Sequence, residues 1–232
     1  RMVDMGFLPQ MRAIMSHVPR ERQTMCFSAT LDPAVAHLVR EYLRNPVRVE
    51  VGSASRPAES VHLKIYQVAR EQKFALLNHL LRTEAGTFLV FTRTKFGAEK
   101  LFKKLVQRGV DAAVLHGGKS QPQRTRALEG FKAGRHRVLI ATDIAARGIH
   151  VKGIAHVINY DIPQAAEDFI HRVGRTGRVE AMGTATTFVM PEETRDIQAI
   201  ERRVGKTIER LPLPENLPLE PRSLHEEAFD MR

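Results

Sequence analysis

The fold class is decided by the stretch Arg137-Val138-Leu139-Ile140-Ala141-Thr142, a continuous apolar run that ends at a hydroxyl side chain. A strand that is covered on both faces has this pattern, because neither of its faces meets solvent. Similar runs lie on both sides of it, at residues 62–69, 87–92, 112–116, 156–160 and 184–189. We expect each of these runs to form a buried strand.

Amphipathic segments separate these runs. Residues 71–83 and 95–109 place leucines and phenylalanines at helical spacing, and the second segment ends at a glycine suited to stopping a helix. A further helix is expected after Ser120, a suitable N-cap, because Gln123 lies three residues on and completes a capping box. Strands that alternate with helices predict an α/β fold with a mostly parallel sheet.

The first 52 residues differ in kind from the rest. They contain helical patterns at 8–17 and from Asp32-Pro33 onward, with short strand-like runs at 24–28 and 47–51. So few elements bury too little apolar area to fold alone. We therefore interpret residues 1–52 as the end of a preceding domain, with Cys26 buried in it as a small apolar side chain.

The remaining chain divides by composition. Residues 53–60 are small, polar and proline-containing, which predicts a linker. The main domain is expected over residues 61–211. Residues 212–232 hold four prolines among charged side chains and predict an extended tail or a strap that docks on a partner protein.

Composition narrows the classes of function. The chain has 36 lysines and arginines against 26 acidic residues, a net charge of +10 that favours a polyanionic partner, because binding phosphates releases counterions. No apolar run reaches the roughly 18 residues of a membrane span. A single cysteine excludes an internal disulfide, and with no signal-peptide pattern at the N-terminus we expect a cytoplasmic location.

The strongest functional pattern is His171-Arg172-Val173-Gly174-Arg175-Thr176-Gly177-Arg178. Its arginines recur at every third position, and the glycines between them are expected to leave the surface open. Arginine binds phosphate through two parallel hydrogen bonds and stays charged, and an arginine delivered to a γ-phosphate raises hydrolysis by roughly 10³ to 10⁵. The segment predicts a nucleotide-phosphate contact, and the alternative is a solvated basic helix end.

Three weaker patterns fit with it. Residues 141–150 begin where the apolar strand ends, and ligands of open α/β sheets bind at that edge. Ser28-Ala29-Thr30 presents hydroxyls at the end of an apolar run. Gln121 and Arg124 lie one turn apart at a helix start, where they can hold a phosphate together.

Residues 117–120 imitate a phosphate-wrapping P-loop, because Gly117-Gly118-Lys119-Ser120 follows a strand and opens a helix. A P-loop needs a glycine five residues before the second of these glycines, and that position is Ala113, inside the strand. We interpret Gly117 and Gly118 instead as a close approach of two backbone segments.

In this order and spacing, the patterns resemble the motifs of the DEAD-box RNA helicases of superfamily 2, most of all the bacterial RhlE/RhlB-type members. Ser28-Ala29-Thr30 resembles the motif that couples the family's two lobes. Residues 90–94 resemble its fourth motif, residues 116–134 the segment that grips RNA, residues 141–148 the fifth motif and residues 171–178 the sixth. The resemblance spans residues 1–190 and implies a RecA-like second lobe, preceded by the remnant of a first RecA-like lobe.

The resemblance implies roles for individual residues. Arg175 and Arg178 are expected to reach the ATP phosphates, Arg178 as the arginine finger, and His171 to couple to Ser28 and Thr30. Further ATP contacts are expected at Gly148 and at His150, where many members have an aspartate that binds the ribose. Contacts to RNA that are largely independent of base sequence are expected at Gly117, Gln121, Arg124, Thr142, Asp143 and Arg93.

The implied function is ATP-dependent unwinding or remodelling of single-stranded or duplex RNA. ATP and Mg²⁺ would be held mostly by parts of the first lobe outside this sequence, so the chain alone is expected to show no RNA-stimulated ATP hydrolysis. Two alternatives stay open: a catalytically inert RNA-binding scaffold, which has no need of Arg175 and Arg178, and a DNA-translocating motor. The tail at 212–232 is the expected contact for protein partners.

Overall fold

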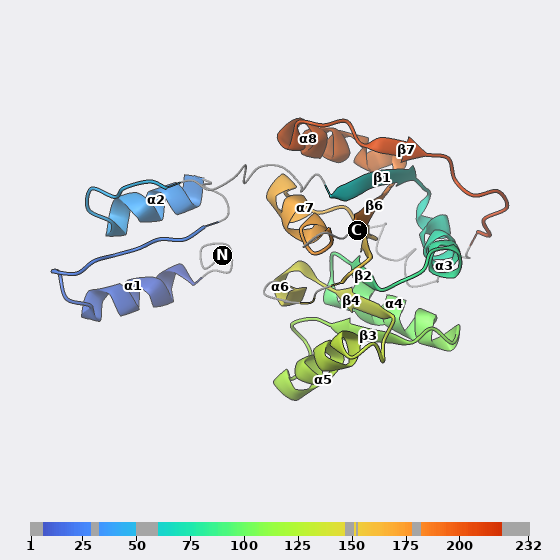
Figure 1. Ribbon diagram of the computed structural model, residues 1–232, viewed down its shortest axis with the longest axis horizontal. Helices are drawn as coiled ribbons and strands as arrows, with labels where there is room; N and C mark the ends of the chain where they lie inside the picture. The colour runs from blue at the N-terminus through green and yellow to red at the C-terminus, as the bar shows by residue number, and fades with distance from the viewer. Residues whose placement is uncertain are drawn as a thin grey trace, which may run out of the picture. The chain divides into compact units, whose positions relative to one another are not determined.

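The computed structural model describes residues 7–28, 33–49, 60–146, 151, 153–177 and 182–219. The chain divides into two compact units, residues 1–55 and residues 56–232. The first unit contains two helices, α1 (Leu8–His17) and α2 (Pro33–Tyr42), drawn in blue in Figure 1. Both agree with the helical patterns of the sequence.

The strands predicted in the first unit are not formed at its described residues 24–28 and 47–49. The apolar side chains there face solvent, with Phe27 88% and Val47 89% exposed, and Cys26 is exposed rather than buried. These predictions were wrong because an apolar pattern is local, whereas a strand needs a neighbouring strand to satisfy its backbone. The described part of this unit supplies no such neighbour.

The second unit is built on a seven-stranded sheet in the order β3-β4-β2-β5-β6-β1-β7, in which every pairing is parallel. The predicted parallel α/β fold is confirmed, and each run predicted in this unit overlaps a strand. The strands are β1 (Val61–Gln67), β2 (Phe88–Phe91), β3 (Ala112–Leu115), β4 (Val138–Ala141), β5 (His156–Asn159), β6 (Gly183–Val189) and β7 (Glu209–Leu211).

Helices cover both faces of the sheet (Figure 1). On one face lie α3 (Lys73–Thr83) and α4 (Lys95–Gln107), and on the other α5 (Gln121–Lys132), α6 (Asp143–Ala146), α7 (Ala166–Val173) and α8 (Thr194–Val204). Short 3-10 turns, η1 (Arg70–Gln72) and η2 (Pro191–Glu193), precede α3 and α8. A hydrophobic core lies on each face of the sheet, and the side chains of β2 enter them alternately. Phe88 and Val90 pack toward α3 and α4, and Leu89 and Phe91 pack toward the helices on the other face.

The order of the strands reverses between β2 and β5. From β2 the chain continues to β3, toward one end of the sheet, and from β5 to β6, toward the other end. In open α/β sheets the crevice at such a point, outside the carboxyl ends of the strands, is where ligands bind. The site residues described below follow these carboxyl ends.

Two features beyond the main sheet pattern concern the end of the described chain. Strand β7 was not predicted, because its three residues are mostly exposed and carry no apolar pattern; it pairs with β1 at the sheet edge. After it, Leu213 and Leu217 pack against the core under α3 and α4. The first described residues of the predicted tail therefore dock on their own domain.

Candidate functional site

The loops that follow β3, β4 and β2 meet at one edge of the sheet. The Thr142 amide, just after β4, donates to Leu115 O at 3.3 Å, and the Thr92 amide, just after β2, donates to Ala141 O at 3.0 Å. The residues predicted to contact RNA therefore lie in the loops after three adjacent strands or in the first turns of the helices that follow, namely Gly117, Gln121, Arg124, Thr142, Asp143 and Arg93.

The start of α5 holds two of these residues in place. The Ser120 amide donates to Gln123 Oε1 at 3.0 Å, as the predicted capping box requires. One turn on, Arg124 Nη1 donates to Gln121 Oε1 at 3.3 Å. Among the described residues, Arg124 Nε is the one buried side-chain nitrogen or oxygen without a hydrogen-bond partner. A buried unpaired donor costs about 1–3 kcal/mol. A ligand oxygen that accepted a hydrogen bond from Arg124 Nε would remove this cost.

The buried side chain of His116, 4% exposed, holds the turn between β3 and α5 in place. Its Nδ1 accepts from the Gly118 amide at 3.0 Å, which leaves Nε2 to donate to Glu99 Oε1 at 2.7 Å. Lys119 binds the same carboxylate. Burial alone would raise the pKa of Glu99, but the hydrogen bonds from Lys119 and His116 outweigh it and lower the pKa.

The glycines of this turn do not serve a close approach of two backbones, so that prediction was wrong. A Cβ on Gly118 would lie 3.1 Å from the His116 ring, a side chain, and a Cβ on Gly117 would meet open space. Gly117 leaves the surface bare beside the predicted RNA contacts, which suits a phosphate that approaches the backbone closely.

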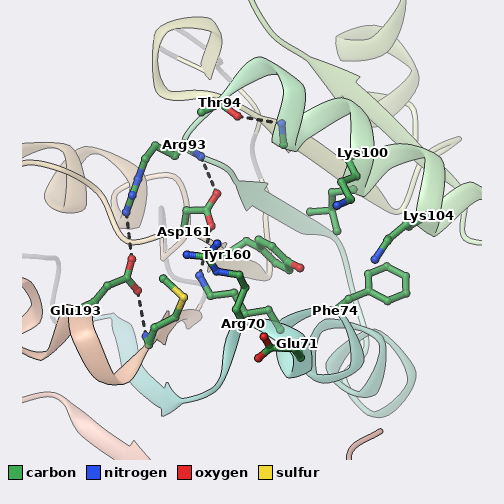
Figure 2. A pocket seen from close by; sticks show the side chains of 14 residues that line it. Arg70, Glu71, Phe74, Arg93, Thr94, Lys100, Lys104, Tyr160, Asp161 and Glu193 are labelled. Atoms are coloured by element: carbon green, nitrogen blue, oxygen red, sulfur yellow. Dashed lines mark hydrogen bonds and ion pairs between the residues drawn. The ribbon is translucent and has the colours of Figure 1, made fainter. Parts of the chain in front are cut away.

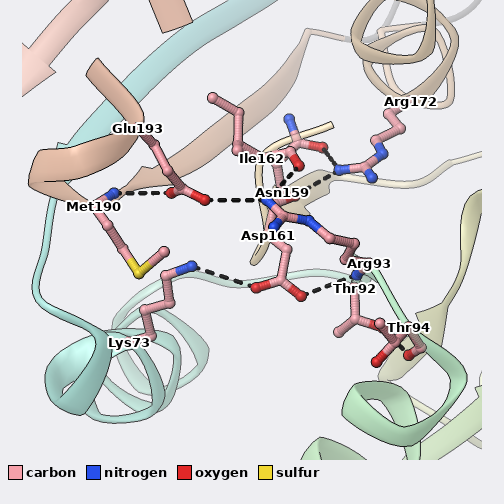
Figure 3. A network of polar contacts seen from close by, with 10 residues as sticks. All are labelled: Lys73, Thr92, Arg93, Thr94, Asn159, Asp161, Ile162, Arg172, Met190 and Glu193. Carbon is pink, nitrogen blue, oxygen red and sulfur yellow. Dashed lines mark hydrogen bonds and ion pairs between the residues drawn. The ribbon is translucent and has the colours of Figure 1, made fainter. Parts of the chain in front are cut away.

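The first arginine of the sixth-motif segment, Arg172, is part of the core. Arg172 is 2% exposed and binds Asp143 with both ends of its fork, Nε to Oδ1 at 2.6 Å and Nη2 to Oδ2 at 2.7 Å. Its Nη1 also donates to Asn159 Oδ1 at 3.1 Å and to Asp161 O at 2.7 Å (Figure 3). Its Cζ lies 5.0 Å from the Phe91 ring centre.

This network changes the roles assigned from the sequence. Arg172 does not face a nucleotide, although the spacing of the arginines suggested one common role. The carboxylate of Asp143 is occupied by Arg172 and would repel a phosphate. An RNA contact at Asp143 would therefore have to use its backbone.

The glycines of the same segment were expected to keep its surface open, and for Gly177 this was wrong. Gly177 has a φ of +66°, and a Cβ there would lie 2.4 Å from Val61 Cγ2. Ser60 Oγ donates to Gly177 O at 2.6 Å, and Thr176, 2% exposed, donates to Ile154 O. This part of the segment packs against the start of β1, and glycine is needed because no side chain fits.

Among the described residues of the segment, 171–177, the half-buried polar side chains are those of His171 and Arg175. They line a hollow of about 10 Å³ together with Asp143 and Arg172. Four of the predicted contact or coupling residues lie outside the described residues, namely Thr30, Gly148, His150 and Arg178. Ser28 is exposed in the first unit.

A larger hollow lies between α3 and α4, at the carboxyl ends of β1, β2 and β5, and we call it the α3–α4 groove (Figure 2). Its volume is about 380 Å³. Sequence reasoning missed it, because its walls come from segments far apart in the chain. The one available signal is the spacing of two lysines, 100 and 104, one turn apart on α4. The basic residues that line it are Arg70, Lys73, Arg93, Lys100 and Lys104.

Two of these cations are held by carboxylates in the same groove (Figure 3). Asp161 Oδ1 lies 3.3 Å from Nζ of the buried Lys73, and Asp161 Oδ2 accepts from the Arg93 amide at 2.9 Å. Glu193 accepts from Arg93 Nη2 at 3.1 Å and from the Met190 amide at 3.0 Å. Arg93 therefore stands between the predicted RNA edge and the groove.

No three acidic, histidine or cysteine side chains come together as a metal-ligand set in the part of the chain that the structure describes. Within the same described ranges, none of the helices is both long and apolar enough to cross a membrane.

Comparison with known proteins gives consistent matches. A family model described as the helicase conserved C-terminal domain matches residues 72–180. The chain is 42% identical over 212 residues to the ATP-dependent RNA helicase RhlB of Pseudomonas syringae pv. tomato, which covers 90% of this chain and 53% of that protein. The chain spans about half the length of the curated relatives it matches.

Two solved structures extend the comparison. S. cerevisiae Dbp5 bound to RNA and ADP BeF3 superposes with a TM-score of 0.83 at 29% identity, covering 91% of this chain and 56% of that one. The E. coli DEAD-box protein SrmB, bound to regulator of ribonuclease activity A, superposes with a TM-score of 0.64 at 32% identity. That match covers 70% of this chain and 96% of the SrmB chain.

Proposed function

The chain belongs to the DEAD-box RNA helicases, and from this premise we propose that it works as part of an ATP-dependent RNA helicase. In this proposal its second unit binds the RNA backbone along the carboxyl ends of β3, β4 and β2. The same unit presents arginines to an ATP that a first lobe holds. Closure of the two lobes then drives local unwinding of RNA or remodelling of its protein complexes.

The observation that carries the RNA part is the meeting of three loops at one sheet edge. Arg124 lies there with a buried Nε that has no partner among the described residues, beside Gln121 and the bare surface at Gly117. A phosphate oxygen would supply the missing acceptor, and arginine is well suited to bind it. The similar Dbp5 chain was solved with RNA and ADP BeF3, which supports the same ligands here.

For the nucleotide part we propose that Arg175 and Arg178 reach the ATP phosphates while Arg172 anchors the segment to the sheet. Four hydrogen bonds hold Arg172, so the end of α7 is fixed before any ligand arrives. A preorganised cation stabilises developing negative charge without a cost of reorganisation. His171, on the same helix, would contact the first lobe.

The exposed thiol of Cys26 suits the reducing cytoplasm proposed as the location.

Arg124→Ala tests the RNA part. We expect the 232-residue chain to bind a single-stranded RNA, and the variant to bind it about fivefold more weakly at 0.1 M monovalent salt. This is the effect of losing one phosphate contact, since each contributes about 0.7 to the slope of log affinity against log salt. Arg126→Ala, an exposed arginine on the same helix, is the matched control and should bind as the parent does. Equal affinities for all three proteins would refute the proposed contact.

RNA-stimulated ATP hydrolysis tests the catalytic part. The chain alone is expected to show none, because the proposal assigns the ATP-holding residues to a first lobe. A protein that joins this chain to that lobe should hydrolyse ATP faster with RNA than with DNA of equal length. No stimulation by either would favour an inert scaffold, and stronger stimulation by DNA would favour a translocating motor. Turnover by the chain alone that Arg178→Ala abolishes would refute this division of labour.

A further inference from the structure

The α3–α4 groove is not part of the edge proposed to bind RNA, but it adjoins that edge. Arg93 belongs to both: it follows β2, next to the loop after β4, and it lines the groove. The groove also lies at the carboxyl ends of β2 and β5, where the strand order reverses. Open α/β sheets bind their ligands at this position.

The charge of the groove favours an anion. Five cationic and three acidic side chains line it, so the lining carries two positive charges in excess. Two of the three carboxylates, Asp161 and Glu193, are in contact with Lys73 and Arg93.

The cations are arranged along a line. Lys100 and Lys104 lie one turn apart on the same face of α4 and follow Arg93 and the helix start at Thr94 (Figure 2). The ammonium group of Lys104 lies 5.0 Å from the Phe74 ring centre, which holds it at the wall of the groove. A compact anion is bound best by cations that converge on one point, whereas a strand of phosphates is bound best by cations in a row.

We propose that single-stranded RNA continues from the edge above β3, β4 and β2, past Arg93, into the α3–α4 groove, where Lys100 and Lys104 bind backbone phosphates. This inference rests on the proposed RNA-binding function and extends its footprint on the second unit. It assigns the groove to the part of the RNA that extends beyond the sheet edge of β3, β4 and β2. We call the RNA site at that edge the main grip. Long strands then bind more tightly than strands that fill the main grip alone.

The test compares RNA strands of about four and about twelve nucleotides, a span that covers the usual site sizes of single-strand binders. The double variant Lys100→Ala/Lys104→Ala should bind the short strand as the parent chain does. For the long strand we expect about 25-fold weaker binding at 0.1 M salt and a salt slope smaller by about 1.4, since two contacts of about 0.7 each are lost. Lys103→Ala, on the same helix but outside the groove, is the matched control and should change neither affinity.

Lys100→Arg/Lys104→Arg keeps both charges and should retain the affinity for the long strand. If it does while the alanine pair does not, charge rather than altered folding of α4 explains the loss. The proposal is overturned if the alanine pair binds both strands as the parent does, or weakens both equally. It is also overturned if millimolar ATP or inorganic phosphate removes the advantage of the long strand, because a free anion would then occupy the groove.

Arg124→Ala separates this inference from the proposed function. It should weaken the binding of short and long strands alike. A normal Arg124→Ala effect with no effect of the lysine pair refutes only the groove. No effect of Arg124→Ala refutes the main grip as well.

Discussion

Arg172→Ala is expected to destabilise the second unit by about 3–5 kcal/mol, the usual cost of removing one partner from a buried ion pair. The arginine side chain is 2% exposed and makes four hydrogen bonds. The truncation leaves the buried Asn159 Oδ1 without this donor, at about 1–3 kcal/mol. Asp143 is less costly to leave unpaired, because its side chain is 26% exposed and water can reach it. The loss should therefore lie near the lower end, about 3 kcal/mol.

Urea unfolding of the 232-residue chain, followed by circular dichroism, measures this loss. For a unit of this size about 3 kcal/mol corresponds to a melting temperature lower by roughly 6–12 °C. The matched control is Arg203→Ala, which removes an exposed ion pair to Glu167 of 3.2 Å between α8 and α7. Exposed pairs contribute about 0–1 kcal/mol, so this variant should unfold almost as the parent does.

A double-mutant cycle shows whether the loss belongs to the pair. Asp143→Ala alone leaves a buried guanidinium without its carboxylate, and the double variant Asp143→Ala/Arg172→Ala removes both charges. The double variant should therefore lose at least about 1 kcal/mol less than the sum of the single losses. A loss below about 1 kcal/mol for Arg172→Ala, or losses that simply add, would refute the view that Arg172 is a core residue.

Two further predictions concern packing and pH. Gly177→Ala should cost about 1–2 kcal/mol from its positive φ and about 1–3 kcal/mol more from overlap with β1. Gly109→Ala, at a positive φ with open space around it, should cost only the first part, and equal losses in thermal unfolding would contradict the packing argument. Glu99→Gln should reduce the loss of unfolding free energy as the pH falls into the acid range. The folded-state pKa of Glu99 is lowered, so its stabilisation is present above the unfolded value of about 4.3 and is lost as pH falls through the folded value. Unchanged acid unfolding midpoints would contradict this.

The central strands of the sheet could be predicted from the sequence because they are covered on both faces. Continuous apolar runs such as residues 88–91 are buried at every position, so the burial that stabilises the strand is also visible in the residue types. The same rule failed at residues 24–28, where an apolar run lacks a neighbouring strand in the described part of the chain. It also missed β7, which pairs through its backbone and carries no apolar signal.

The place of the candidate site in the fold could be predicted, but the structural roles of its side chains could not. The ends of strands locate the loops, and the parallel sheet then brings Thr142, Gln121 and Arg124 to one edge. The spacing alone could not separate Arg172 from Arg175, although the family resemblance assigned ATP contacts to Arg175 and Arg178 and no role to Arg172. Only the helix orientation, which turns Arg172 toward Asp143, shows that one anchors and the other is partly exposed. The groove was not predictable, since its walls come from four distant segments.

Asp161 ties these parts together. Its carboxylate accepts from the Arg93 amide at 2.9 Å and lies 3.3 Å from Lys73 Nζ, while its carbonyl accepts from Arg172 Nη1 at 2.7 Å. One residue just after β5 therefore fixes the proposed RNA contact, a wall of the groove and α7, the helix that precedes Arg175. A satisfied buried polar network of this kind holds its members in one arrangement. The proposed closure of the two lobes on RNA and ATP would then move the second unit as one body, because rearrangement inside it would break these bonds.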